Sequence, residues 1–333
     1  MRHASVEPSV PEKDVAYRPS LVYRLITLVL AFAYGSILAS LPLDVFKDRA
    51  NYMRYAASSW DIFGSYWSHG TVVALANEPV WLLLNSFLAN FLSAETVLRI
   101  IIFVPAVVVA RFVLLQSPKD FVWLLLFLIF PQVIKNYIIH LRQGEAIAVF
   151  LVGWSIQSKP WRWMLMGIAP FIHSSFFLIL GLLGLSRAML LLRLGPDLRA
   201  LLFAAASISV GLVLGPLASL LGARQAQNYE FAMGYGSGLG FLFWAAIFVI
   251  MCLQGRRYVR SYAFEMGIIL FFLATYFLID MGARIFESAL ILVFLAGLHL
   301  TGWRRAVFLA SICFYVVVQY SARLSQPWMG WGI

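Results

Sequence analysis

The stretch 138-IIHLRQGEAIAVFLVGWSIQSKPWRWMLMGIAPFIHSS-175 decides the fold, because its two apolar segments flank a turn with two cations, Lys159 and Arg162. A helix of about 17 residues, rising about 1.5 Å per residue, covers roughly 25 Å, close to the thickness of a bilayer core. Arg142 and Lys159 are therefore expected at opposite edges of a membrane. The second segment then returns His173 towards the edge that holds Arg142, and a helical hairpin is expected to turn near His173.

The composition is also that of a membrane protein. Of the 333 residues 62% are hydrophobic and only 12% are charged, and the mean hydropathy is +0.85, outside the range of soluble globular domains. The net charge of +10 comes from cations scattered at the ends of apolar runs, which is typical of topology signals and anionic-lipid contacts rather than nucleic-acid binding. Cys252 and Cys313 lie inside apolar runs, so no disulfide framework is expected.

These patterns predict an all-α polytopic membrane protein with about eleven transmembrane helices. Residues 1–20 are expected to form a polar cytoplasmic tail, 21–323 a single transmembrane domain, and 324–333 a short outer tail. The expected spans are 21–43, 95–115, 120–138, 142–158, 161–173, 174–192, 200–221, 239–254, 264–282, 285–302 and 306–323.

The orientation depends on residues 78–92, which are apolar but short and contain two asparagines. If this segment does not span, most of the 25 lysines and arginines fall on the N-terminal side of the membrane. The positive-inside rule favours that arrangement, with the N-terminus in the cytoplasm and 78–92 at the outer interface. The polar residues of the long loop 44–94, which is expected to contain interfacial helices, then share the outer face with Arg142 and His173. Chemistry is therefore expected on the outer side.

Arginines open two of the expected helices at this outer edge, Arg142-Gln143 and Arg284. A guanidinium is a permanently charged fork that matches phosphate oxygens two at a time, so two of them at membrane depth suit a lipid-linked diphosphate. The alternative is that each arginine reaches lipid headgroups, or pairs locally with Glu145 or Asp280.

A polar triplet, His173-Ser174-Ser175, interrupts an apolar run at the same edge. Histidine titrates near neutrality and can transfer a proton to or from a substrate. The alternative is a histidine whose hydrogen bonds are satisfied by a neighbouring helix.

Carboxylates and aromatic rings gather after the first span. Asp48 is followed by Tyr52 and Tyr55 on one helical face, which suits activation of a sugar hydroxyl while rings stack on pyranose faces. An interfacial amphipathic helix is the alternative. Glu78, before Pro79, is a second carboxylate candidate. No metal-ligand spacing, Walker loop or dinucleotide fingerprint is present in the sequence, so neither a metal nor a cofactor is expected.

Several of these motifs together resemble the EpsG family of Wzy-like bacterial polysaccharide polymerases, over about residues 44 to 290. The matching pieces are Asp48 with Tyr52, Glu78-Pro79, Arg142-Gln143-Gly144-x-Ala146, His173-x-Ser175 and a late Arg284. Glu145 departs from the family, whose members more often have an apolar residue there. The long outer loop is also similar to that of GT-C membrane glycosyltransferases, in which an acidic residue of this loop is catalytic.

The resemblance implies polymerisation of undecaprenyl-diphosphate-linked repeat units at the outer face of the bacterial inner membrane, without a nucleotide sugar. In that function Asp48, or failing that Glu78, accepts the proton of the acceptor hydroxyl. Arg142 and Arg284 stabilise the departing diphosphate, and His173 assists. Further substrate contacts are expected from Gln143, Ser175, Tyr52, Tyr55, Arg224 and Tyr229, and exposed rings such as Tyr52, Trp60, Trp67 and Tyr229 are expected to line the glycan path.

The expected partners are the lipid-linked oligosaccharide substrate, membrane lipids and a copolymerase that regulates chain length, with no nucleic acid. Two other function classes stay open. One is a transporter or flippase of the same lipid-linked sugars, although the chain has no visible repeat and its polar residues gather at one face. The other is an O-antigen-type ligase or acyltransferase, which would use similar chemistry on a different acceptor.

Overall fold

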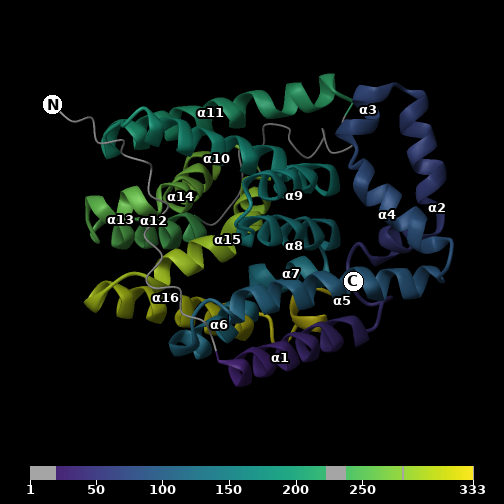
Figure 1. Cartoon of the computed structure of the whole chain (residues 1–333), viewed down its shortest axis with the longest axis horizontal. Coiled ribbons are helices and arrows are strands. Elements are labelled where there is room, and N and C mark those ends of the chain that lie inside the picture. The colour runs from purple at the N-terminus through teal and green to yellow at the C-terminus, as the bar shows by residue number, and fades with distance from the viewer. Residues whose placement is uncertain (1–19, 223–237, 280, 333) are drawn as a thin grey trace.

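The computed structural model of the chain describes residues 20–222, 238–279 and 281–332. It is 81% helix and contains no strand among these residues. The fold is therefore all-α, as the hydropathy pattern predicts (Figure 1).

The helices follow most of the apolar runs, but the expected span 120–138 is divided at Phe130, and the helix expected over 264–282 ends at Thr275. In chain order they are α1 (Leu21–Ser40), α2 (Arg49–Ser68), α3 (Thr71–Ala76), α4 (Pro79–Ala89), α5 (Ala94–Leu114), η1 (Pro118–Asp120), α6 (Phe121–Leu128), α7 (Pro131–Ile138), α8 (Leu141–Ser155), α9 (Lys159–Ile172), α10 (Ser175–Leu191), α11 (Pro196–Leu220), α12 (Leu239–Cys252), α13 (Arg256–Ser261), α14 (Ala263–Thr275), α15 (Gly282–Leu298), α16 (Gly302–Ser321) and η3 (Pro327–Gly330).

Several of these helices are apolar enough for a membrane. Within the described ranges, α1, α5 and α11 are each long enough to cross a bilayer, and the pair of 118–128 and α7 forms a fourth candidate bent by 60°. The bend follows from Pro131, because the residue before a proline avoids helical geometry and Phe130 has φ −58° and ψ 130°. The other apolar helices are shorter, so the number of spans, about eleven, stays a prediction.

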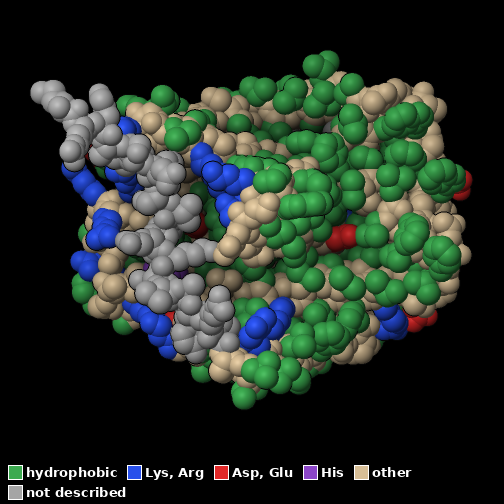
Figure 2. Space-filling view, in the orientation of Figure 1, with side chains coloured by type: hydrophobic (Ala, Val, Ile, Leu, Met, Phe, Trp, Pro, Cys, Tyr) green, Lys and Arg blue, Asp and Glu red, His purple; other side chains and the backbone are tan. Residues whose placement is uncertain are grey.

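The surface agrees with a membrane location. Large apolar side chains such as Leu201, Leu212 and Val213 of α11 are more than half exposed, and Figure 2 shows hydrophobic side chains over much of the visible face. Lysine and arginine side chains concentrate at the end of the bundle where Figure 1 places α13. The opposite end holds α2, α3 and α4, which are the helices of the loop 44–94.

The length of α4 decides whether this helix alone could cross a membrane. It has 11 residues, so its length is about 16 Å, roughly half of a bilayer core. Helix α4 alone is thus too short to cross a bilayer. The interfacial position of 78–92 stays a prediction.

Helix α15 lies at the centre of the core, because nearly every residue from Gly282 to Leu298 is buried. Helix α15 packs against α14, α10, α7 and α8. A buried ion pair, Lys135 Nζ to Glu287 Oε1 at 2.8 Å, joins α7 to α15. Because α7 ends only three residues before α8 begins, this pair places the start of α8 near α15, where Gln143 forms hydrogen bonds with it.

Gly144 allows the first turn of α8 to lie against α7. A Cβ at this position would stand 2.4 Å from the carbonyl oxygen of Asn136 and 3.0 Å from the Tyr137 ring. We expect Gly144→Ala to cost about 1–3 kcal/mol, because backbone must move to relieve the clash. The melting temperature of the purified protein measures this effect. Gly167→Ala in α9 is the matched control, since a Cβ there meets no heavy atom within 4 Å. Equal melting temperatures for the two variants would contradict the close approach.

Candidate functional site

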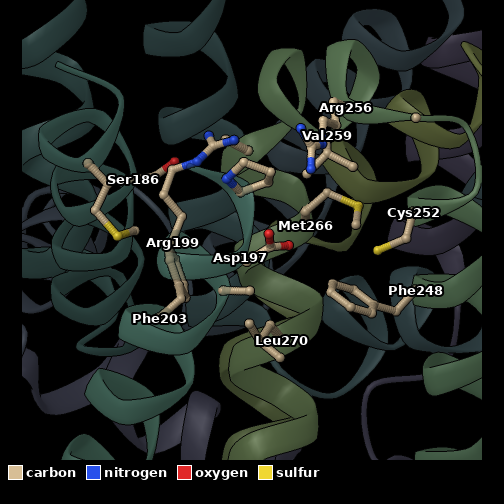
Figure 3. Close-up of a pocket in the computed structure, with 16 residues that line it drawn as sticks. Ser186, Asp197, Arg199, Phe203, Phe248, Cys252, Arg256, Val259, Met266 and Leu270 are labelled. Carbon is tan, nitrogen blue, oxygen red and sulfur yellow. The ribbon is translucent and has the colours of Figure 1, made fainter. Parts of the chain in front are cut away.

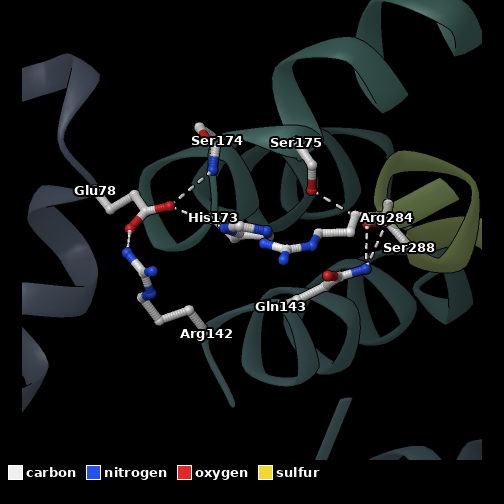
Figure 4. Close-up of polar contacts among 8 residues, drawn as sticks. All are labelled: Glu78, Arg142, Gln143, His173, Ser174, Ser175, Arg284 and Ser288. Carbon is white, nitrogen blue, oxygen red and sulfur yellow. Dashed lines mark hydrogen bonds and ion pairs between the residues drawn. The ribbon is translucent and has the colours of Figure 1, made fainter. Parts of the chain in front are cut away.

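The carboxylate of Glu78 is the centre of a polar cluster (Figure 4). Its Oε2 accepts a hydrogen bond from Nη1 of Arg142 in an ion pair. Its Oε1 accepts from Nδ1 of His173 at 2.8 Å and from the backbone N–H of Ser174 at 3.3 Å. Glu78 is only 4% exposed, so both oxygens are used inside the protein. Glu78 therefore links α4, α8 and the junction between α9 and α10.

The backbone at Glu78 is in the left-handed region, with φ 60° and ψ 56°, immediately before Pro79 begins α4. Asp48, which precedes α2, has φ 64° as well. This conformation costs a non-glycine residue about 1–3 kcal/mol and persists where surrounding contacts fix it. At Glu78 the ion pair and the two hydrogen bonds provide those contacts.

Arg142 lies in an aromatic and acidic setting. Its guanidinium carbon is 5.6 Å from the centre of the Tyr55 ring, and the buried Tyr52 lies close enough to interact with its charge. Both tyrosines pack edge-on against Trp81. The Nε of Arg142 is buried, and no described residue forms a hydrogen bond with it. The guanidinium is thus held between the Glu78 carboxylate and the tyrosines of α2.

His173 lies at the break between α9 and α10, with extended backbone (φ −147°, ψ 121°). The helix therefore breaks at His173, where the sequence predicts a turn, and the hairpin itself stays a prediction. Since the Glu78 carboxylate can only accept, Nδ1 must carry the proton of the hydrogen bond between them. Nε2 is then the ring nitrogen that can exchange a proton with a substrate, as in the carboxylate-histidine pairs of hydrolases.

A second network ties α8 and α10 to α15. Nε2 of Gln143 donates to the backbone oxygen of Arg284 at 2.7 Å and to Oγ of Ser288 at 3.1 Å, and the hydroxyls of Ser175 and Ser288 are 3.1 Å apart. Gln143 and Ser175 are almost completely buried. Their side chains join these helices, and a direct contact with the substrate stays a prediction.

Several cations act on His140. Burial lowers the pKa of His140, which precedes α8, and the charges of Lys135, Arg284 and Arg142 lower it further, to about 2. The Arg284 side chain is exposed and extends from the first turn of α15 towards His173 in Figure 4. Lys135 and Arg142 are paired with Glu287 and Glu78, so the exposed Arg284 is the cation of this group that favours an anionic ligand.

The structure brings together Glu78, Arg142, His173 and Arg284, and it places the other predicted residues Gln143, Ser175, Tyr52 and Tyr55 around them. Asp48 is exposed at the start of α2 and interacts electrostatically with Tyr52. Arg224, Tyr229 and Asp280 lie outside the described residues.

One alternative and one expectation about individual contacts were wrong. Arg142 pairs with Glu78 of α4 and not with Glu145 of its own helix, because the first turn of α8 faces the loop helices. Glu145 is buried, and its Oε2 has no hydrogen-bond partner in the part of the chain that the structure describes. Tyr52 is only 5% exposed beside Trp81, so it does not line an open path, whereas Trp60 and Trp67 are 65% and 56% exposed.

Sequence reasoning missed Ser288 and the Lys135–Glu287 pair. Ser288 lies four residues after Arg284, on the same helical face, so that spacing was an available signal. The ion pair joins residues distant in the sequence, which no local pattern indicates. Among the described residues there is no group of three or more His, Cys, Asp or Glu side chains that could hold a metal ion.

No family model, no curated protein and no solved structure matches the chain.

Proposed function

We propose that the protein is a membrane glycosyltransferase that joins lipid-diphosphate-linked oligosaccharide repeat units, with its site at the outer face of a bacterial inner membrane. The observation that supports this proposal most is the placement of the Glu78 carboxylate between Arg142 and His173, beside the exposed cation Arg284. The cluster combines a positive region for a diphosphate with a histidine oriented for proton transfer. The motif resemblance to EpsG-type polymerases adds the substrate class.

The reaction requires one bond to form and one to break. The acceptor hydroxyl oxygen attacks the anomeric carbon of the donor sugar, and the bond from that carbon to the diphosphate breaks. Nε2 of His173 takes the hydroxyl proton, while Glu78 holds the ring and stabilises the imidazolium that forms. Arg142 and Arg284 stabilise the charge that develops on the leaving diphosphate.

This assignment changes the role of Glu78. Both of its oxygens already accept hydrogen bonds from protein groups, so it acts through His173 and Arg142 as a positioning residue. Asp48, exposed near Tyr52, is the alternative proton acceptor. The exposed rings of Trp60 and Trp67 on α2 offer stacking surfaces for the glycan.

The experiment that tests the function uses purified protein in liposomes with lipid-linked repeat units. We expect products longer than one repeat, together with release of the lipid diphosphate. Redistribution of the substrate between leaflets without elongation would instead identify a flippase. Transfer of intact glycan to an added non-lipid acceptor, without elongation, would identify a ligase.

The ionisation of Glu78 gives a prediction about pH. Burial raises the pKa of its carboxyl, but the charge of Arg142, the His173 hydrogen bond and the Ser174 N–H outweigh burial and lower the pKa from 4.5 to about 2. A depressed pKa means that the carboxylate stabilises the fold above about pH 4.5 and that this stabilisation is lost as the pH falls towards about 2. We expect the melting temperature of Glu78→Gln to lie below that of wild type by a constant amount from about pH 5 to 8.

Below about pH 4 the difference between the two proteins should shrink. Glu95→Gln is the control, since this carboxylate pairs with Arg99 but is 58% exposed. A difference that grows as the pH falls from neutrality to about 5 would contradict the depressed pKa of Glu78.

A further inference from the structure

A cavity lies at the basic end of the bundle (Figure 3). Its volume is about 290 Å³, and residues of α10, α11, α12, α13 and α14 line it. Helix α14 packs against both α11 and α12 and forms the floor through Met266, Gly267 and Leu270. None of the residues of the Glu78 cluster lines this cavity, so it is a separate site.

Arg199 is the main reason to expect a ligand in this cavity. It lies in the first turn of α11, lines the cavity and is only 7% exposed. Its Nε and Nη1 are buried, and no described residue forms a hydrogen bond with them. A buried guanidinium with two unused donors costs free energy unless an acceptor satisfies them. The fork of donors suits the oxygens of a phosphate.

Other positive charges near Arg199 also favour a phosphate in the cavity. The first turn of α11, which starts at Pro196, presents the positive end of a 25-residue helix to the cavity. Arg256 also lines it, and Arg260 is close enough to act on Arg199. Asp197 is the opposing charge, but none of the ion pairs among the described residues joins it to Arg199 or Arg256. The local balance is therefore positive.

The remainder of the cavity is apolar. Figure 3 shows Arg199 and Arg256 at one end, and Phe203, Phe248 and Leu270 at the other. The helices that flank the cavity expose large apolar side chains, including Leu201 of α11 and Val249 of α12, so its surroundings suit hydrocarbon. The volume lies at the small end of ligand pockets, enough for a headgroup and the first part of a chain.

We propose that this cavity binds the phosphate of an anionic membrane lipid, with Arg199 and Arg256 at the phosphate and the start of the lipid chains among Phe203, Phe248 and Leu270. The basic end of the bundle is the cytoplasmic end in the orientation that the charge distribution favours, so the lipid comes from the cytoplasmic leaflet. This site is independent of the proposed polymerase reaction, which uses the opposite end of the bundle.

Cys252 provides a direct test, because it lines the cavity and is exposed. In a Cys313→Ser background, it is the only thiol that N-ethylmaleimide can label. We expect labelling to be at least about fivefold slower in nanodiscs that contain phosphatidylglycerol than in nanodiscs of phosphatidylcholine alone. A bound lipid would then occupy the cavity and shield Cys252 for most of the time.

Variants separate specific binding from general attraction to anionic lipid. Arg199→Gln should raise the phosphatidylglycerol concentration that gives half-maximal protection about tenfold, because a charge-assisted contact is lost. Ala200→Phe should remove protection by filling the cavity from an exposed position of α11. Arg257→Gln is the matched control, because Arg257 is exposed beside Arg256 but does not line the cavity. It should retain protection.

Three results would overturn the proposal. The first is equal protection by the two lipid mixtures, and the second is full protection in both Arg199→Gln and Ala200→Phe. The third is equal protection by inorganic phosphate in phosphatidylcholine nanodiscs, which would assign the cavity to a soluble anion. Because the labelling needs no oligosaccharide substrate, its outcome does not depend on the polymerase activity.

Discussion

Replacing Arg142 by alanine is expected to abolish polymer formation in cells while the chain still inserts in the membrane. A charge-assisted donor that acts on charge developed in the transition state is worth about two to three orders of magnitude in rate, enough to leave no detectable polymer. Gel analysis of the extracted polysaccharide measures the loss, and immunoblots of the membrane fraction measure the protein. Arg142→Lys should recover only a small part of the activity, because an ammonium lacks the planar fork.

Loss of Arg142 has a structural consequence that the experiment must separate from chemistry. The substitution leaves Glu78 as a buried charge without its strongest partner, at a cost of about 3–5 kcal/mol. The double variant Glu78→Gln/Arg142→Met removes both charges, so it should fold well and still make no polymer. Arg99→Ala is the control, since Arg99 forms an exposed ion pair with Glu95. Polymer of normal length in a well-accumulated Arg142→Ala protein would rule out the assignment.

Much of the fold could be predicted from the sequence because hydropathy acts locally. The apolar runs give the helices to within a few residues, and the polar triplet at His173 marks the break between α9 and α10. The number of helices that span alone could not be predicted in the same way. Helices such as α12 and α14 have only 14 and 13 residues, so length alone does not decide whether they cross.

The candidate site was predictable in its residue types but not in its contacts. Arg142, His173 and Glu78 each stood out because a charged or polar group beside apolar sequence has a desolvation cost that needs compensation. Their arrangement around one carboxylate depends on how α4 meets α8, a contact between segments more than 60 residues apart. Local spacing suggested Glu145 as the partner of Arg142, whereas tertiary packing selected Glu78.

The assignment of His173 as the proton acceptor leads to the second large expected effect. In His173→Asn the side-chain amide N–H takes the place of Nδ1–H and keeps the hydrogen bond to Glu78, but nothing replaces Nε2. We therefore expect near-normal stability and a rate of elongation in liposomes lower by about two to four orders of magnitude, the usual contribution of general base catalysis.

Two further variants make this test specific. His299→Asn changes an exposed histidine whose Nδ1 is 2.9 Å from the backbone oxygen of Leu295, so it should elongate at the wild-type rate. Asp48→Asn should lose less than about tenfold, since in our assignment this exposed carboxylate does not take the proton. If His173→Asn stays active while Asp48→Asn is inactive, the proton acceptor is Asp48. The Glu78–His173 pair would then be a structural link between α4 and the α9–α10 junction, because its hydrogen bond would hold the helices without taking part in proton transfer.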